Sequence, residues 1–142
     1  GIVKDNQAYL FFGPSGSGKT TVARLCTPNL VLNDDLLFLS RNQHDCWQAH
    51  STPFWNRSQV QPTNQNAPLS ALYRLVQAKR VNRQIMSQGQ ALAELISSIP
   101  ILPLSKSHLP ALIKTLDTII QSMPIYYLYF LQDHSFWSLV SN

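Results

Sequence analysis

The sequence predicts an α/β fold built around one glycine-rich loop, and three observations lead to that prediction. Residues 8–12 form an apolar, aromatic run with the length of a buried strand. Residues 13–20 follow at once and satisfy the G-x-x-x-x-G-K-[ST] pattern of a P-loop. Residues 21–25 then continue as a helix. Strand, loop and helix therefore come in the order that this motif requires.

The other elements are predicted from apolar patterning, turn residues and helix caps. Strands are predicted at residues 1–4, 30–32, 36–40, 46–50, 69–77 and 125–131, with 36–40 and 46–50 forming a hairpin. Helices are predicted from a Ser87 cap to just before Pro100, at residues 109–123 with an apolar core stripe, and at the C-terminus after a Ser135 cap. Residues 51–68 are predicted to be a long loop. Its aromatic residues, Phe54 and Trp55, cover the core or close over a ligand, and we favour the first.

Length and composition indicate one globular domain. The chain has 142 residues, of which 44% are hydrophobic and 13% charged, and its formal net charge is +4. The basic residues are scattered apart from Lys79, Arg80 and Arg83, which we expect in a solvated turn, so we expect no nucleic-acid partner. The sequence contains neither an apolar run of about 18 residues nor a signal-peptide pattern at its start.

The cysteines and histidines show no metal-binding pattern. Cys26 and Cys46 make neither a disulfide framework nor a zinc site, and we expect both to be small buried hydrophobes in a reducing environment. Of the four histidines, only His50 is a candidate for a place near a ligand. These features predict a soluble, cytoplasmic protein with no membrane partner. Because the chain begins at Gly1 without a Met, we expect a fragment lacking an N-terminal part, or a processed chain.

The loop pattern predicts nucleotide binding for geometric reasons. Glycines let the backbone curl close to a polyphosphate, successive N–H groups point inward, and the following helix adds partial positive charge. Lys19 would reach the β- and γ-phosphates, and the Thr20 hydroxyl would bind Mg²⁺. The predicted nucleotide-binding residues are Gly13, Pro14, Ser15, Gly16, Ser17, Gly18, Lys19, Thr20 and Thr21. The alternative is a Gly/Ser turn that matches the pattern by chance.

Phosphoryl transfer also needs carboxylates, to bind Mg²⁺ and to orient or deprotonate the nucleophile. Of the seven acidic residues, five are explained as turn residues, polar helix-face residues or a cap neighbour: Asp5, Asp45, Glu94, Asp117 and Asp133. Asp34 and Asp35 remain, at the end of a predicted strand, where α/β sheets present ligand-binding groups. One carboxylate could hold Mg²⁺ while the other accepts a proton. The alternative is a plain Asn-Asp-Asp turn.

Several segments together narrow the prediction to a family. They are the loop at 13–20, Asn-Asp-Asp at 33–35, Thr-Pro-Phe-Trp at 52–55, Ala-Pro-Leu-Ser-Ala-Leu-Tyr-Arg-Leu at 67–75, Pro-Ile-Tyr-Tyr-Leu-Tyr-Phe at 124–130 and Phe-Trp-Ser-Leu-Val at 136–140. In these the chain resembles the HPr kinase-related family, which is similar to HPr kinase/phosphorylase and, more distantly, to phosphoenolpyruvate carboxykinases. The resemblance implies a P-loop core with a mixed β-sheet flanked by helices, unlike the purely parallel sheet of common P-loop NTPases.

The resemblance also implies an activity, the ATP-dependent phosphorylation of a Ser or similar hydroxyl on a protein or peptide. It implies that Lys19 and Thr20 bind the phosphates and Mg²⁺. Asp35 would be the base that accepts the hydroxyl proton, and Asp34 its partner on the metal side. Because HPr kinases assemble into rings, a homo-oligomer is a further expectation.

Two features of the family's pattern are missing from the chain. Nothing between Phe54 and Arg83 supplies the Glu of a Glu-x-Arg-Gly segment, and a His-Gly pair on the strand before the loop would precede Gly1. Two other functions therefore stay open. One is a catalytically degenerate ATP-binding module that regulates a partner, and the other is a simple P-loop NTPase that uses water.

Overall fold

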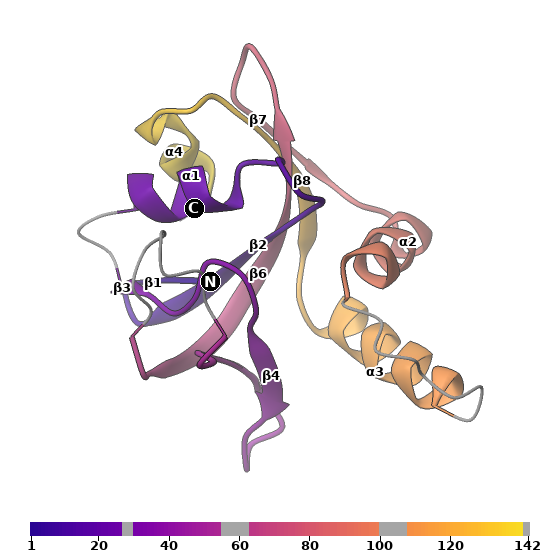
Figure 1. Ribbon diagram of the computed structural model, residues 1–142. Helices are drawn as coiled ribbons and strands as arrows, with labels where there is room; N and C mark the ends of the chain where they lie inside the picture. The colour runs from indigo at the N-terminus through magenta and orange to yellow at the C-terminus, as the bar shows by residue number, and fades with distance from the viewer. Residues whose placement is uncertain (27–29, 55–62, 100–107, 141–142) are drawn as a thin grey trace.

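The computed structural model describes residues 1–26, 30–54, 63–99 and 108–140, which form a mixed α/β structure with eight strands in one sheet (Figure 1). The strands are β1 (Ile2–Lys4), β2 (Gln7–Phe12), β3 (Leu30–Val31), β4 (Phe38–Arg41), β5 (Trp47–His50), β6 (Asn66–Gln77), β7 (Asn82–Ile85) and β8 (Ile125–Phe130). The helices are α1 (Lys19–Leu25), α2 (Gln88–Ser98), α3 (Leu109–Ser122) and α4 (Trp137–Val140), with a 3-10 turn at His134–Phe136 before α4. The prediction of an α/β fold is confirmed.

Parallel pairing at the centre of the sheet decides where the glycine-rich loop lies. β6 pairs in parallel with β2 on one side and with β8 on the other, whereas all other pairings among the described strands are antiparallel. β3 runs in the same direction as β2, because each of them is antiparallel to β1. The carboxyl ends of β2, β3, β6 and β8 therefore point to one edge of the sheet. This is the edge at which open α/β sheets bind ligands.

Two apolar clusters cover the two faces of the sheet. On one face α1, α4 and the 3-10 turn pack on buried strand residues that include Phe11 and Tyr73. On the other face α2 and α3 pack on residues that include Phe12 and Leu72. Figure 1 shows the two groups of helices on opposite sides of the strands. Successive strand residues alternate between these faces, and Tyr73 and Arg74 lie on opposite faces as predicted.

The sheet departs from the prediction at two places. β6 begins inside the predicted loop, because Asn66, Ala67 and Pro68 pair with β5. Pairing with β5 makes these three residues part of a strand, since they carry little strand propensity of their own. β7 was not predicted, and it places Arg83 in a strand with its guanidinium carbon 4.7 Å from the centre of the Tyr126 ring. The expectation of a solvated turn was therefore wrong for Arg83.

Helix ends follow local signals, with one correction. The Ser87 side chain accepts a hydrogen bond from the Gln90 backbone N–H, and the Gln90 side chain accepts one from the Ser87 N–H, which completes a capping box at α2. The cap predicted at Ser135 is wrong. The cap of the 3-10 turn before α4 is Asp133, whose carboxylate accepts a hydrogen bond from the backbone N–H of Ser135 at 2.9 Å.

Some side chains that were expected in the core lie at the surface. Leu109 and Ile113 of α3 are 47% and 39% exposed, so its apolar stripe is only partly core. Cys26 is buried as predicted, whereas Cys46 is exposed in the turn between β4 and β5. Among the described residues, no helix is long and apolar enough to cross a membrane.

Ser87→Ala is expected to lower the free energy of unfolding by about 1 kcal/mol, because an N–H group at the start of α2 loses its partner. Ser97→Ala is the control, since the exposed Ser97 hydroxyl bonds the Glu94 carbonyl in the same helix, and such surface changes cost less than about 0.5 kcal/mol. Urea unfolding followed by circular dichroism measures both variants. Equal losses would contradict the capping role.

Candidate functional site

The glycine-rich loop leaves β2 at Gly13 and enters α1 at Lys19. Gly18 has a φ of 106°, which disfavours other residues, and a Cβ at this position would lie 2.5 Å from Cζ of Phe130. Gly16 also has a positive φ, 80°, but no atom lies within 4 Å of the place its Cβ would take. The loop therefore packs closely against β8 at Gly18 and leaves open space at Gly16.

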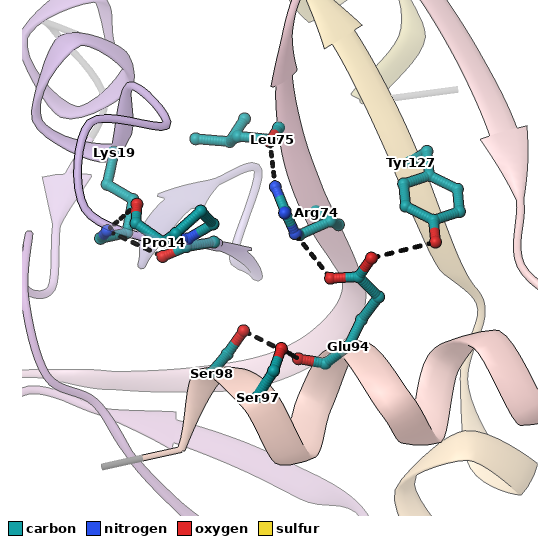
Figure 2. Close-up of polar contacts among 9 residues, drawn as sticks. Pro14, Lys19, Arg74, Leu75, Glu94, Ser97, Ser98 and Tyr127 are labelled. Carbon is teal, nitrogen blue, oxygen red and sulfur yellow. Dashed lines mark hydrogen bonds and ion pairs between the residues drawn. The ribbon is translucent and has the colours of Figure 1, made fainter.

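Lys19 reaches back across the loop (Figure 2). Its Nζ donates to the carbonyl oxygens of Gly13 at 2.9 Å and Pro14 at 3.0 Å. An ammonium group has three N–H donors, so one remains beyond these two bonds. Burial lowers the pKa of Lys19, and the Asp35 carboxylate opposes this shift. The geometry fits a lysine that spans the loop and presents its charge to a polyphosphate.

Asn33 holds the carboxylate pair in place, although the sequence indicated no more than a turn residue. It is 1% exposed, and its Oδ1 accepts from the backbone N–H groups of Asp35 at 2.8 Å and Leu36 at 3.1 Å. Its Nδ2 lies 3.0 Å from the carbonyl oxygens of both Thr52 and Phe54. Asn33 therefore ties the turn that carries both aspartates to the segment after β5.

The segment after β5 also corrects the expectation for Phe54. Its side chain is 65% exposed and does not cover the core, while Trp55 lies outside the described residues. His50 lies in the hairpin, where its Nε2 is 2.8 Å from the Ser40 hydroxyl.

Asp34 and Asp35 have different surroundings. Asp34 is 8% exposed, and its Oδ1 has no hydrogen-bond partner among the described residues, whereas Asp35 is exposed. Burial raises the pKa of Asp34, and the neighbouring Asp35 carboxylate adds to that rise. A buried carboxylate oxygen without a partner is costly unless it binds a cation or a proton. Asp34 thus fits a ligand of Mg²⁺, which prefers oxygen donors.

One cavity brings the loop and the carboxylates together. It has a volume of about 370 Å³ and is lined by Ser15, Gly16, Gly18, Lys19, Thr20, Thr21, Asp34, Asp35 and Gln77. Three predicted loop residues do not line it. Gly13 and Pro14 accept hydrogen bonds from Lys19, and the buried Oγ of Ser17 has no partner in the described part of the chain. The predicted loop and the predicted carboxylate pair, far apart in sequence, face the same space.

The sequence did not indicate Gln77, which lines the cavity, or Arg74, which lies beside the loop at Gly13. The Gln77 Nε2 donates to the carbonyl oxygen of Gly16 at 2.9 Å. The Arg74 Nε donates to the Glu94 carboxylate at 2.8 Å (Figure 2), so Glu94, predicted to be a polar helix-face residue, forms an ion pair that the sequence did not indicate. Both missed residues lie near the carboxyl end of β6. The strand itself was predicted, but its parallel pairing with β2, which brings them to the loop, was not.

Within the described residues, no group of three or more His, Cys, Asp or Glu side chains could hold a metal ion. Mg²⁺ at Asp34 would therefore take further ligands from phosphate oxygens and water, as this ion usually does. No protein-family model, curated protein or solved structure matches the chain. What the chain does has to be inferred from the geometry of the cavity.

Gly18→Ala is expected to destabilise the protein by at least about 2 kcal/mol, because left-handed strain and a clash with Phe130 add together. Gly16→Ala is the matched control, with the strain but not the clash, and should cost about 1 kcal/mol. Thermal unfolding of both variants measures the difference. The packing of the loop on β8 is refuted if Gly16→Ala is as harmful as Gly18→Ala.

Asp34→Asn is expected to stabilise the protein by about 1 kcal/mol near neutral pH, because it removes the charge of a buried carboxylate whose Oδ1 has no hydrogen-bond partner among the described residues. Since burial raises the pKa of Asp34 above its ordinary value of 3.8, the native state binds this proton more tightly than the unfolded state. The wild type therefore loses stability as the pH rises through the native pKa. The advantage of the variant should vanish below the ordinary pKa.

Urea unfolding at about pH 7 and about pH 3 tests this expectation for Asp34. Asp45→Asn is the control, because the Asp45 side chain is 71% exposed and pairs with Arg41 at the surface. It should give no gain in stability at either pH. A loss of stability in Asp34→Asn at neutral pH would mean that the charge of Asp34 is compensated in the native state.

Proposed function

We propose that the chain binds ATP and Mg²⁺ in this cavity and transfers the γ-phosphate of ATP to a hydroxyl of a protein or peptide, as an HPr serine kinase-like enzyme. One observation carries the proposal, namely that Lys19 and both carboxylates, Asp34 and Asp35, line the same cavity. A cation for the phosphates, a carboxylate for the metal and a carboxylate for the acceptor proton are the groups that phosphoryl transfer requires.

The phosphates of ATP would lie along the loop. Lys19 keeps one N–H donor beyond its bonds to Gly13 and Pro14, and this donor serves the β- and γ-phosphates. Thr20 lines the same cavity, and its hydroxyl together with the Asp34 carboxylate would hold Mg²⁺. When bound, the metal ion neutralises negative charge on the phosphate oxygens.

Asp35 is the proposed base. It is exposed, so an acceptor hydroxyl can approach it. Its backbone N–H donates a hydrogen bond to Oδ1 of Asn33, which fixes the turn that carries it. The acceptor oxygen forms a bond to the γ-phosphorus while the bond between that phosphorus and the β–γ bridging oxygen breaks, and ADP leaves. The hydroxyl proton passes to the Asp35 carboxylate. Lys19 stabilises the charge on the phosphate oxygens during transfer.

The proposal extends to the fold type and the partner. The mixed pairing of β2, antiparallel to β1 and parallel to β6, supports a P-loop core of the HPr kinase and phosphoenolpyruvate carboxykinase type. The proposed partner is a protein or peptide with a Ser hydroxyl, in the cytoplasm. The free thiols of Cys26 and Cys46 support that compartment.

Incubation with γ-labelled ATP, Mg²⁺ and a lysate or candidate peptides tests the function. Wild-type protein should label an acceptor, and Lys19→Ala should abolish ATP binding because the loop loses its cation. Asp35→Asn should keep ATP binding but lower acceptor labelling at least about 100-fold, the size of a general-base contribution. Asp45→Asn, a surface carboxylate variant, should label as the wild type does.

The outcomes separate the proposed kinase from its two alternatives. Free phosphate without a labelled acceptor would replace the kinase with a simple NTPase. Tight ATP binding without turnover would indicate a regulatory module. Full acceptor labelling by Asp35→Asn would overturn the assignment of the base, and full ATP affinity in Lys19→Ala would overturn the nucleotide site itself.

A further inference from the structure

Arg74 lies against the start of the glycine-rich loop. In the parallel pairing of β2 and β6 it is the partner of Phe12, the residue directly before Gly13. Its Nη1 lies 3.1 Å from the position that a Cβ would take on Gly13. Gly13 is also the residue whose carbonyl oxygen binds Lys19. Two cationic side chains, Lys19 and Arg74, therefore approach the same loop residue from different elements.

Arg74 is held in this position by groups on three elements. Its Nε donates to Oε2 of Glu94 on α2 at 2.8 Å, and its Nη1 donates to the carbonyl oxygen of Leu75. The Tyr127 hydroxyl on β8 donates to the other oxygen of Glu94 at 3.1 Å. Figure 2 shows Arg74 between Glu94 and Tyr127 on one side and the loop residues Pro14 and Lys19 on the other.

The guanidinium keeps donors for a further ligand. It has five N–H donors, and the bonds to Glu94 and Leu75 use two of them, which leaves three without a partner in the described part of the chain. The side chain is only 18% exposed, so these donors are largely withdrawn from bulk water. The positive charge of Arg74 also acts on Lys19, whose pKa it helps to lower. An anion bound between the two cations would relieve this repulsion.

We propose that Arg74 is a second phosphate-binding cation of the site and that it binds the terminal phosphate of ATP beside Lys19. This inference rests on the proposed function. The γ-phosphate is favoured because Lys19, which reaches the β- and γ-phosphates in such loops, is bound at Gly13, where Arg74 also lies. An arginine from the same chain is one way in which nucleotide-hydrolysing enzymes stabilise the charge of the transferred group.

Glu94 is a positioning residue in this proposal. It holds the guanidinium through Nε and leaves the three Nη donors that do not bond Leu75 for the phosphate, while Tyr127 fixes the Glu94 carboxylate. A purely structural role would make the same pair a connection between α2 and the sheet. The two roles predict different effects of substitution. In a structural ion pair the loss of either side chain has the same effect, whereas in phosphate binding only the loss of Arg74 removes a contact with the ligand.

Isothermal titration calorimetry with ATP and with ADP, both with Mg²⁺, tests the proposal. Arg74→Met should weaken ATP binding at least about 10-fold and ADP binding less than about 3-fold, because ADP lacks the terminal phosphate. Arg74→Lys should restore part of the loss. Glu94→Gln keeps an oxygen that can accept from the Arg74 Nε and removes a competing anion, so it should bind ATP at least as tightly as the wild type. Arg41→Met, which breaks a surface ion pair with Asp45, should leave both affinities unchanged.

The double variant Arg74→Met, Glu94→Gln separates binding from folding. Arg74→Met by itself leaves a half-buried Glu94 without its cation and lowers the unfolding temperature, and the second substitution should recover that temperature but not the ATP affinity. The proposal is overturned if the double variant regains ATP affinity, or if ATP and ADP weaken equally. If Lys19→Ala loses ATP while Arg74→Met binds it normally, only the inference on Arg74 fails. If the wild type binds no ATP, the proposed function fails, and this inference with it.

Discussion

The parallel pairing of β2 with β6 is the constraint on which the site depends. It places Phe12, the last residue before the loop, beside Arg74, and it brings Gln77 at the end of β6 to the carbonyl of Gly16. A loop that follows β2 must therefore lie against the carboxyl end of β6. A slip of one residue in this register would turn Arg74 to the opposite face of the sheet, away from Glu94.

The charges around the cavity are only partly balanced by one another. Arg74 is paired with Glu94, and Lys19 feels both the attraction of Asp35 and the repulsion of Arg74. Asp34 is buried, with one oxygen lacking a partner among the described residues. A polyphosphate would compensate the positive charges of Lys19 and Arg74, which repel each other. A divalent cation beside Asp34 would compensate the negative charges of Asp34 and Asp35 in the same way. This is the electrostatic support for a metal–nucleotide ligand.

Elements with a local signal were predicted, and those that depend on a distant partner were not. Asp5 was predicted to be a turn residue, and it lies with Asn6 in the turn between β1 and β2, where the two adopt positive φ angles of 51° and 61°. The capping box of α2 is equally local. The first residues of β6 and the whole of β7 become strands by pairing with β5 and β8. Their own composition does not mark them as strands. The contact of Glu94 with Arg74 joins α2 to β6, and helical periodicity by itself placed Glu94 on a polar face.

The sequence by itself determined the loop pattern at residues 13–20, the lysine within it and the adjacent carboxylates Asp34 and Asp35. These follow from residue type and spacing along the chain, which need no knowledge of pairing. Only the tertiary structure decided that the loop and the carboxylates line one cavity, and that Asp34 is buried while Asp35 is exposed. It also decided that Arg74 lies beside Gly13. The physical reason is that strand direction and register bring residues together across long stretches of chain, and no local pattern encodes either of them.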